Sequence, residues 1–77
     1  MAATLLTTAE TEAGHYLDGY ANEFDRTPSQ DGRAGVGEWE FSAKLTWMAY
    51  LVDQFGRVAV EAERASLDAI WDRVFWA

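Results

Sequence analysis

One stretch of this chain has the composition of a loop, and it divides the chain into two parts. Residues 25–37, DRTPSQDGRAGVG, contain the one proline and three of the six glycines. Proline and glycine interrupt helices and strands, so these residues predict a flexible loop. A loop of this length in a small domain is typically functional or disordered. We expect regular elements on both sides of it, within a single domain of residues 1–77.

Packing has to hold these elements together, because the chain has no cysteine. With 77 residues, of which 49% are hydrophobic, the chain has material for one small core. The absence of thiols excludes disulfides, cysteine nucleophiles and thiolate zinc sites, and it suits the reducing cytoplasm, where we expect the protein. No stretch approaches the roughly 18 apolar residues that span a bilayer, so no membrane association is expected.

An amphipathic helix is predicted for about residues 8–24. Its apolar residues recur at helical spacing and fall within an arc of about 140° at 100° per residue. They are Ala9, Ala13, Tyr16, Leu17, Tyr20, Ala21 and Phe24. Thr7 and Glu10 have the spacing of a capping box, which predicts that the helix begins there.

The pattern changes to a period of two after the loop. Five polar residues from Glu38 to Thr46 alternate with five apolar residues from Trp39 to Trp47. Such alternation is typical of a half-buried strand and predicts one long strand at about 37–52. The same segment also contains a stripe at helical spacing, made of Phe41, Leu45, Met48, Val52 and Phe55. The strand is the preferred interpretation and a helix is the alternative.

A hairpin is predicted next, because Asp53 and Gly56 suit the two ends of a four-residue loop. Residues 57–62 would then pair with the long strand. A second amphipathic helix, with Ser66 as its N-cap, is predicted for about residues 66–76. We therefore expect an α+β domain, in which two helices pack on a small antiparallel sheet, and an all-α three-helix bundle is the alternative.

The acidic residues are concentrated in the first third of the chain. The net charge is −7, and five carboxylates precede the first basic residue, Arg26. An acidic surface repels nucleic acid and anionic membranes and is steered toward basic surfaces. Direct nucleic-acid binding is therefore disfavoured, and Glu12, Asp18 and Glu23 are candidate contacts with a basic partner.

No motif in the chain supports catalysis or a cofactor. Glu12 and His15 have the Glu-x-x-His spacing of di-iron bundles, but a second such pair is missing, so an exposed histidine is expected. The serines lack the setting of a catalytic nucleophile, and the glycines of residues 32–37 lack the helix that phosphate binding requires. We predict a protein that is not an enzyme and that needs neither a metal nor another cofactor.

Four apolar residues are candidates for a partner-binding surface. On the second face of the predicted hairpin, Met48, Tyr50 and Val52 would form an apolar patch with a charged rim, which is the composition of an interface. The alternative, that a helix covers this patch, is equally open. Trp76 lies opposite the apolar arc of the last helix, and tryptophan is a frequent hot-spot residue. The alternative for Trp76 is that its indole folds back onto the protein.

These features predict a small, acidic, non-enzymatic protein-binding module. Its expected partner is a protein or complex with a basic surface, such as a nucleic-acid-handling complex. By analogy, its most concrete form is a phage or mobile-element inhibitor comparable with anti-CRISPR or host-takeover proteins. A homo-oligomeric structural protein, or a small subunit of a larger complex, is the alternative.

Overall fold

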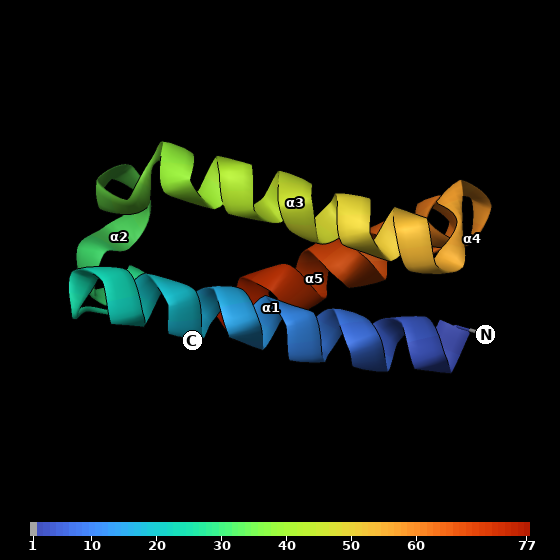
Figure 1. Cartoon of the computed structure of the whole chain (residues 1–77), viewed down its shortest axis with the longest axis horizontal. Helices are drawn as coiled ribbons and strands as arrows, with labels where there is room; N and C mark the ends of the chain where they lie inside the picture. The colour runs from blue at the N-terminus through green and yellow to red at the C-terminus, as the bar shows by residue number, and fades with distance from the viewer. Residues whose placement is uncertain (1) are drawn as a thin grey trace.

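The chain is a bundle of helices (Figure 1). The computed structural model describes residues 2–77, which form α1 (Ala2–Phe24), α2 (Pro28–Val36), α3 (Glu38–Phe55), α4 (Arg57–Ala62) and α5 (Arg64–Phe75). The long helices α1 and α3 run in opposite directions across the molecule, and α5 lies behind them in this view. The short helices α2 and α4 turn the chain at the two ends of the bundle.

The α+β prediction is wrong, and the all-helical alternative fits the structure. No strand occurs within residues 2–77, because the expected strands at 37–52 and 57–62 are the helices α3 and α4. The segment predicted as a loop, residues 25–37, holds α2. The helices predicted at 8–24 and 66–76 are present as α1 and α5, but both begin earlier.

The two helix starts were misplaced because the supposed cap residues lie inside helices. Thr7 is within α1, where its Oγ1 donates a hydrogen bond to the carbonyl oxygen of Ala3 over 2.9 Å. Ser66 is within α5, whose N-cap is Glu63. Threonine and serine often bond to the carbonyl four residues earlier in a helix, so these side chains do not require a helix end.

The alternation in α3 arises from two apolar stripes on one helix. Trp39, Ala43 and Trp47 are spaced by four residues and lie on the side that packs on the core. Phe41 and Leu45 are also spaced by four residues and lie on the outer side, where both are exposed. Two interleaved stripes of period four produce a period of two in the sequence, and that period imitated a strand.

Small residues on α1 pack against α5, and these two helices make the most extensive contact in the bundle. Ala9 and Ala13 are fully buried on this side of α1, as are Leu67 and Trp71 on α5. Trp47 of α3 is also fully buried, and its Nε1 donates to the carbonyl oxygen of Ala9 over 2.9 Å. The polar edge of the indole is thereby satisfied inside an apolar core.

Aromatic rings fill the space between α3 and α5. The centroids of Trp47 and Trp71 are 5.0 Å apart, and Trp71 stacks on Phe75 at 4.7 Å. Trp39 stacks on Phe75 from α3 at 5.9 Å. Each buried aromatic ring removes roughly 150–250 Å² from water, so this layer supplies much of the stabilisation available to so short a chain.

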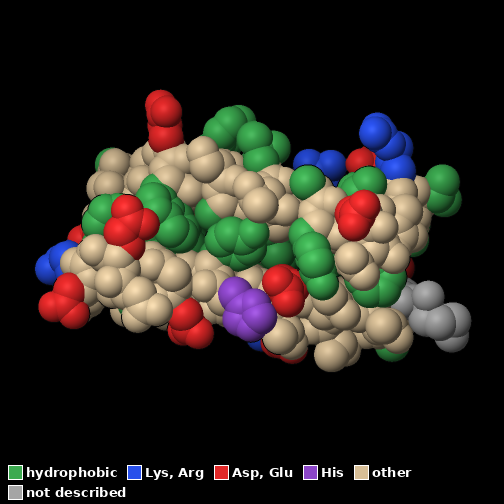
Figure 2. All heavy atoms as spheres, viewed as in Figure 1, with side chains coloured by type: hydrophobic (Ala, Val, Ile, Leu, Met, Phe, Trp, Pro, Cys, Tyr) green, Lys and Arg blue, Asp and Glu red, His purple; other side chains and the backbone are tan. Residues whose placement is uncertain are grey.

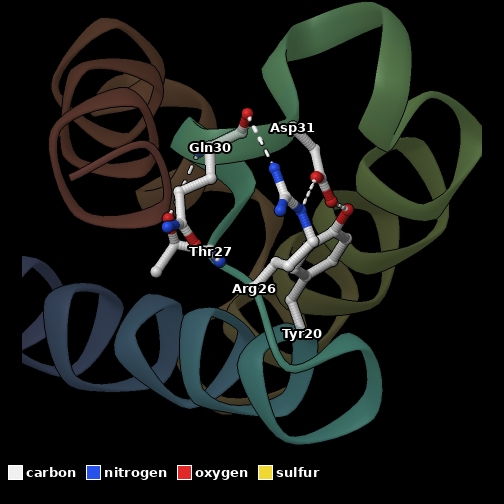
Figure 3. Close-up of polar contacts among 5 residues, drawn as sticks. All are labelled: Tyr20, Arg26, Thr27, Gln30 and Asp31. Atoms are coloured by element: carbon white, nitrogen blue, oxygen red, sulfur yellow. Dashed lines mark hydrogen bonds and ion pairs between the residues drawn. The ribbon is translucent and has the colours of Figure 1, made fainter.

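A polar network joins α1 to α2 (Figure 3). Tyr20 on α1 and Arg26 in the connection both donate hydrogen bonds to the carboxylate of Asp31, one to each oxygen. These two donors lower the pKa of Asp31, the Tyr20 hydroxyl having the larger effect, whereas the bond to Asp31 raises the pKa of Tyr20. Thr27 and Gln30 cap the start of α2 reciprocally, which satisfies two backbone amides.

Candidate functional site

The outer side of α3 carries an apolar stripe that the bundle leaves uncovered at one end. We call Phe41, Leu45, Met48 and Val52 the outer stripe, and at 100° per residue they fall within about 60° of one another. Phe41 is 67% exposed and Leu45 56%, while Met48 and Val52 are half-buried against the core. Hydrophobic side chains protrude from this edge of α3 in Figure 2.

The structure does not bring the three predicted hairpin residues together. Met48 and Val52 lie on the outer stripe, but Tyr50 is about 160° from each of them around the helix. Tyr50 is 40% exposed. The patch expected from a shared strand face therefore does not exist, since a helix separates residues that alternate.

Trp76 is held against the protein. Its ring packs half-buried on the core, and its Nε1 donates to Oε2 of Glu40 over 3.0 Å. The guanidinium of Arg33 lies 4.6 Å from the ring centroid, and Ser29 Oγ donates to the backbone oxygen of Trp76 over 2.7 Å. This is the folded-back arrangement, in which contacts from α2 and α3 fix the end of α5.

The predicted acidic contacts separate into two groups on α1. Glu12 and Glu23 lie within about 40° of Tyr16 around the helix, on the edge that faces α3. Glu23 accepts a hydrogen bond from Trp39 Nε1 over 3.3 Å. Asp18 is exposed on a different side of α1. Glu12 and Glu23 therefore share one side of α1, about 16 Å apart along the helix axis, and Asp18 does not lie on that side.

An open groove of about 460 Å³ lies between α1 and α3. Its lining consists of Tyr16, Glu38, Trp39, Ser42, Ala43 and Thr46. Burial raises the pKa of the Tyr16 hydroxyl, and the negative charge of Glu12 raises it further, so this hydroxyl is protonated at neutral pH. The groove thus combines two aromatic rings, hydroxyl groups and a carboxylate.

His15 lies on the surface of α1 beside Glu12. Its Nδ1 is 3.5 Å from the Glu12 carboxylate, and its side chain is 64% exposed. Within residues 2–77, no group of three or more histidine, aspartate or glutamate side chains is arranged to hold a metal ion. None of the helices in the described part of the chain is both long and apolar enough to cross a bilayer.

Sequence reasoning did not select the residues that form the exposed end of the stripe or the groove. Phe41 and Leu45 were expected on the apolar face of a strand, or in the alternative helical stripe, and Tyr16 and Trp39 were expected on apolar faces of their elements. The spacing of 41, 45, 48 and 52 is the signal that could have found the stripe. The groove had no such signal, because its two sides come from helices far apart in the sequence.

Comparison with protein-family models, with curated proteins and with solved structures gave no match. The function of the chain is therefore argued from the geometry and charge of its surfaces.

Proposed function

We propose that this chain is a small protein-binding module that inserts the outer stripe of α3 into an apolar groove of a partner protein. The observation that carries the proposal is the exposure of Phe41 and Leu45 on a helix that buries other residues, Ala43, Trp47 and Leu51, in the core. Anchors at positions i, i+4, i+7 and i+11 are typical of helix-in-groove recognition. The outer stripe has this spacing.

Folding alone does not account for the outer stripe. The core-facing side of α3 already buries Ala43, Trp47 and Leu51. A large aromatic side chain that is two-thirds in water adds little to stability, and an adjacent exposed leucine enlarges the apolar patch. Exposed apolar side chains grouped on a rigid helix mark a binding surface.

The charges around the outer stripe favour a partner with a basic rim. Glu38 and Asp53 are exposed near the two ends of α3, and neither forms an ion pair with another residue of the described chain. Most of the basic side chains are already paired with carboxylates: Arg26, Arg33, Lys44, Arg64 and Arg73. The net charge of −7 accelerates encounter with a basic surface.

A module of this kind suits inhibition of a nucleic-acid-handling complex. Such complexes carry basic grooves, and an acidic protein with an apolar anchor can occupy one through a mixed interface. Negative charge alone does not suffice for binding such a complex, because several carboxylates near α5 are paired with arginine side chains and are partly neutralised. The apolar anchor is therefore the element on which binding depends.

Affinity capture with matched variants tests the proposal. The wild type, a Phe41→Ser/Leu45→Ser variant and a Val58→Ser variant are immobilised and exposed to lysate at low and high salt, with mass spectrometry of the captured proteins. Val58 is 85% exposed on α4 and lies outside the outer stripe, so its variant is the control. We expect the wild type and the control to retain one partner that the double variant loses.

Self-association is the competing outcome. If the wild type captures only itself and its mass in solution rises with concentration, the outer stripe pairs with a second copy. A partner retained equally by the double variant would contradict the proposal. So would a wild type that captures nothing and stays monomeric at every concentration.

A further inference from the structure

We infer that the groove between α1 and α3 is a receptor for a guanidinium group, carried by an arginine side chain of the partner. This inference rests on the proposed function, because the arginine is taken to belong to the same partner that receives the outer stripe. The groove and the stripe are neighbouring surfaces of α3: Glu38 lies about 60° from Phe41 around the helix, and Ser42 about 100°.

The shape and lining of the groove suit a planar group on an apolar stem. Its volume is about 460 Å³, and it is open to solvent along one side. Tyr16 and Trp39 provide aromatic surface, and Ala43 adds an apolar side chain. The hydroxyl groups of Ser42 and Thr46 offer hydrogen-bond acceptors. A guanidinium stacks on aromatic rings and donates five hydrogen bonds in one plane.

One carboxylate lines the groove, and two more lie along the edge of α1 that faces α3. Glu38 lines it from the first turn of α3, and Glu12 and Glu23 lie on the facing edge of α1. Glu23 accepts a hydrogen bond from Trp39, which lines the groove, and Glu12 lies about one helical turn before Tyr16 on α1. Among the described residues, no lysine or arginine lines the groove.

The face of the molecule that carries this groove also has no lysine or arginine visible near its centre, although the one histidine lies there (Figure 2). Figure 2 shows hydrophobic side chains in the furrow between α3 and α1, with acidic side chains around them, while lysine and arginine lie toward the margins. An aromatic surface within a negative field attracts a cation, and a desolvated cation gains most from it. A neutral or anionic ligand would gain nothing from these carboxylates.

The chain itself contains one arginine that is bound by an indole ring and a carboxylate. Arg33 places its guanidinium 4.6 Å from the ring centroid of Trp76 and pairs with Asp72 at 3.8 Å. That arrangement, an arginine between an indole and a carboxylate, is the one inferred for the groove with Trp39 and Glu38. Arginine fits it better than lysine, because an ammonium is more strongly hydrated and lacks a plane to stack.

Titration with a small arginine probe tests the inference on the full chain. N-acetyl-arginine N-methylamide is added to ¹⁵N-labelled protein, and the backbone amides and the Trp39 indole are followed by NMR. We expect saturable shifts confined to Tyr16, Trp39 and residues 38–46, with a dissociation constant on the order of millimolar, since one side chain supplies few contacts. The matched citrulline derivative, which is neutral and nearly isosteric, is expected to produce no saturable shifts.

Two variants and one control assign the site. Glu38→Gln is expected to weaken probe binding by about two- to fivefold, and Ser42→Leu to abolish it by filling the groove. Asp53→Asn removes the same charge about 22 Å further along α3 and should leave binding unchanged. Shifts spread over all acidic surfaces, equal binding of citrulline, or equal loss in Asp53→Asn would overturn the inference. Tighter binding of the matched lysine derivative would overturn the assignment to guanidinium.

The groove and the outer stripe can fail separately. If the partner is captured through Phe41 and Leu45 while Glu38→Gln and Ser42→Leu capture it equally well, the groove inference fails and the proposed function stands. If the probe binds in the groove but capture does not depend on the outer stripe, the proposed function fails.

Discussion

Trp71 and Trp76 donate hydrogen bonds to one and the same oxygen atom. Their Nε1 atoms lie 2.8 Å and 3.0 Å from Oε2 of Glu40 on α3. Trp71 is fully buried, so its N–H has no access to water. The Glu40 carboxylate therefore connects the end of α5 to the beginning of α3.

Replacing Glu40 should lower the free energy of unfolding, because the buried indole N–H of Trp71 then loses its hydrogen-bond acceptor. Glu40→Leu leaves the indole N–H of Trp71 without an acceptor, and we expect a loss of about 1–3 kcal/mol in the free energy of unfolding. Glu40→Gln keeps an acceptor oxygen and should lose less. Urea denaturation followed by circular dichroism measures both, with Glu38→Gln in the same turn as a control. Equal stability of Glu40→Leu and the control would contradict the structure.

Trp47 should be among the most sensitive positions of the core. Trp47→Ala removes a fully buried ring and the bond to Ala9, and we expect destabilisation of about 3–5 kcal/mol. That is a large fraction of the stability of a small domain, about 5–15 kcal/mol. Thermal and urea denaturation provide the measurement.

Leu45→Ala is the matched comparison for Trp47→Ala, and it also distinguishes the two stripes of α3. Because Leu45 is 56% exposed, its truncation should change the free energy of unfolding by no more than about 0.5 kcal/mol. A loss comparable with that of Trp47→Ala would show that the outer stripe is part of the core and would remove the basis of the proposed interface.

Asp31 should make stability depend on pH in the acidic range. Its pKa is lowered in the folded state by the Tyr20 hydroxyl and by Arg26. The carboxylate therefore stabilises the fold above its unfolded pKa of about 3.9, and this contribution disappears as the pH falls through the lower folded value. We expect Asp31→Asn to be less stable than the wild type at pH 7.

The difference between Asp31→Asn and the wild type should narrow as the pH falls below about 4. Urea denaturation at a series of pH values measures it, and Asp18→Asn, on an exposed site of α1, provides the control. A difference that stays constant down to pH 2 would mean that Asp31 acts through its shape and not through its charge.

Two glycines should respond oppositely to alanine. Gly56 separates α3 from α4 with φ 87° and ψ 152°, a conformation essentially restricted to glycine, so Gly56→Ala should destabilise the protein by about 1–3 kcal/mol. Gly14 is helical, and a Cβ there would meet no atom within 4 Å. Gly14→Ala should therefore stabilise the protein by about 0.5–1 kcal/mol. Thermal denaturation of both variants checks the pair.

Local patterns predicted the outer helices correctly and the middle of the chain incorrectly. The 3.6-residue periodicity of α1 and α5 was unambiguous, because one side of each helix is apolar. In α3, Phe41 and Leu45 interleave with Trp39, Ala43 and Trp47. Local sequence cannot distinguish two apolar stripes of one helix from the single apolar face of a strand. Only the position of α1 and α5 decides which stripe is buried.

The start of α2 is predictable from the local sequence, although this segment was predicted as a loop. Thr27, Pro28 and Gln30 have the arrangement of an N-cap, a first-turn proline and the partner of a capping box, and the structure shows that capping. Proline and glycine content favoured a loop instead. The contacts of Glu40 with Trp71 and Trp76 join residues more than 30 positions apart, so no local pattern contains them.

The close packing of α1 on α5 has a consequence for the order in which the chain can fold. The first helix finds its main packing surface in the last one, so a chain that is still being synthesised holds α1 without its partner until Leu67, Trp71 and Phe75 have left the ribosome. A helix in a protein gains most of its stability from the packing of its apolar side, and α1 lacks that packing until α5 is present. The bundle therefore forms only after α5 has been synthesised. The contacts between α1 and α5 join residues far apart in the sequence, so forming them closes a long loop.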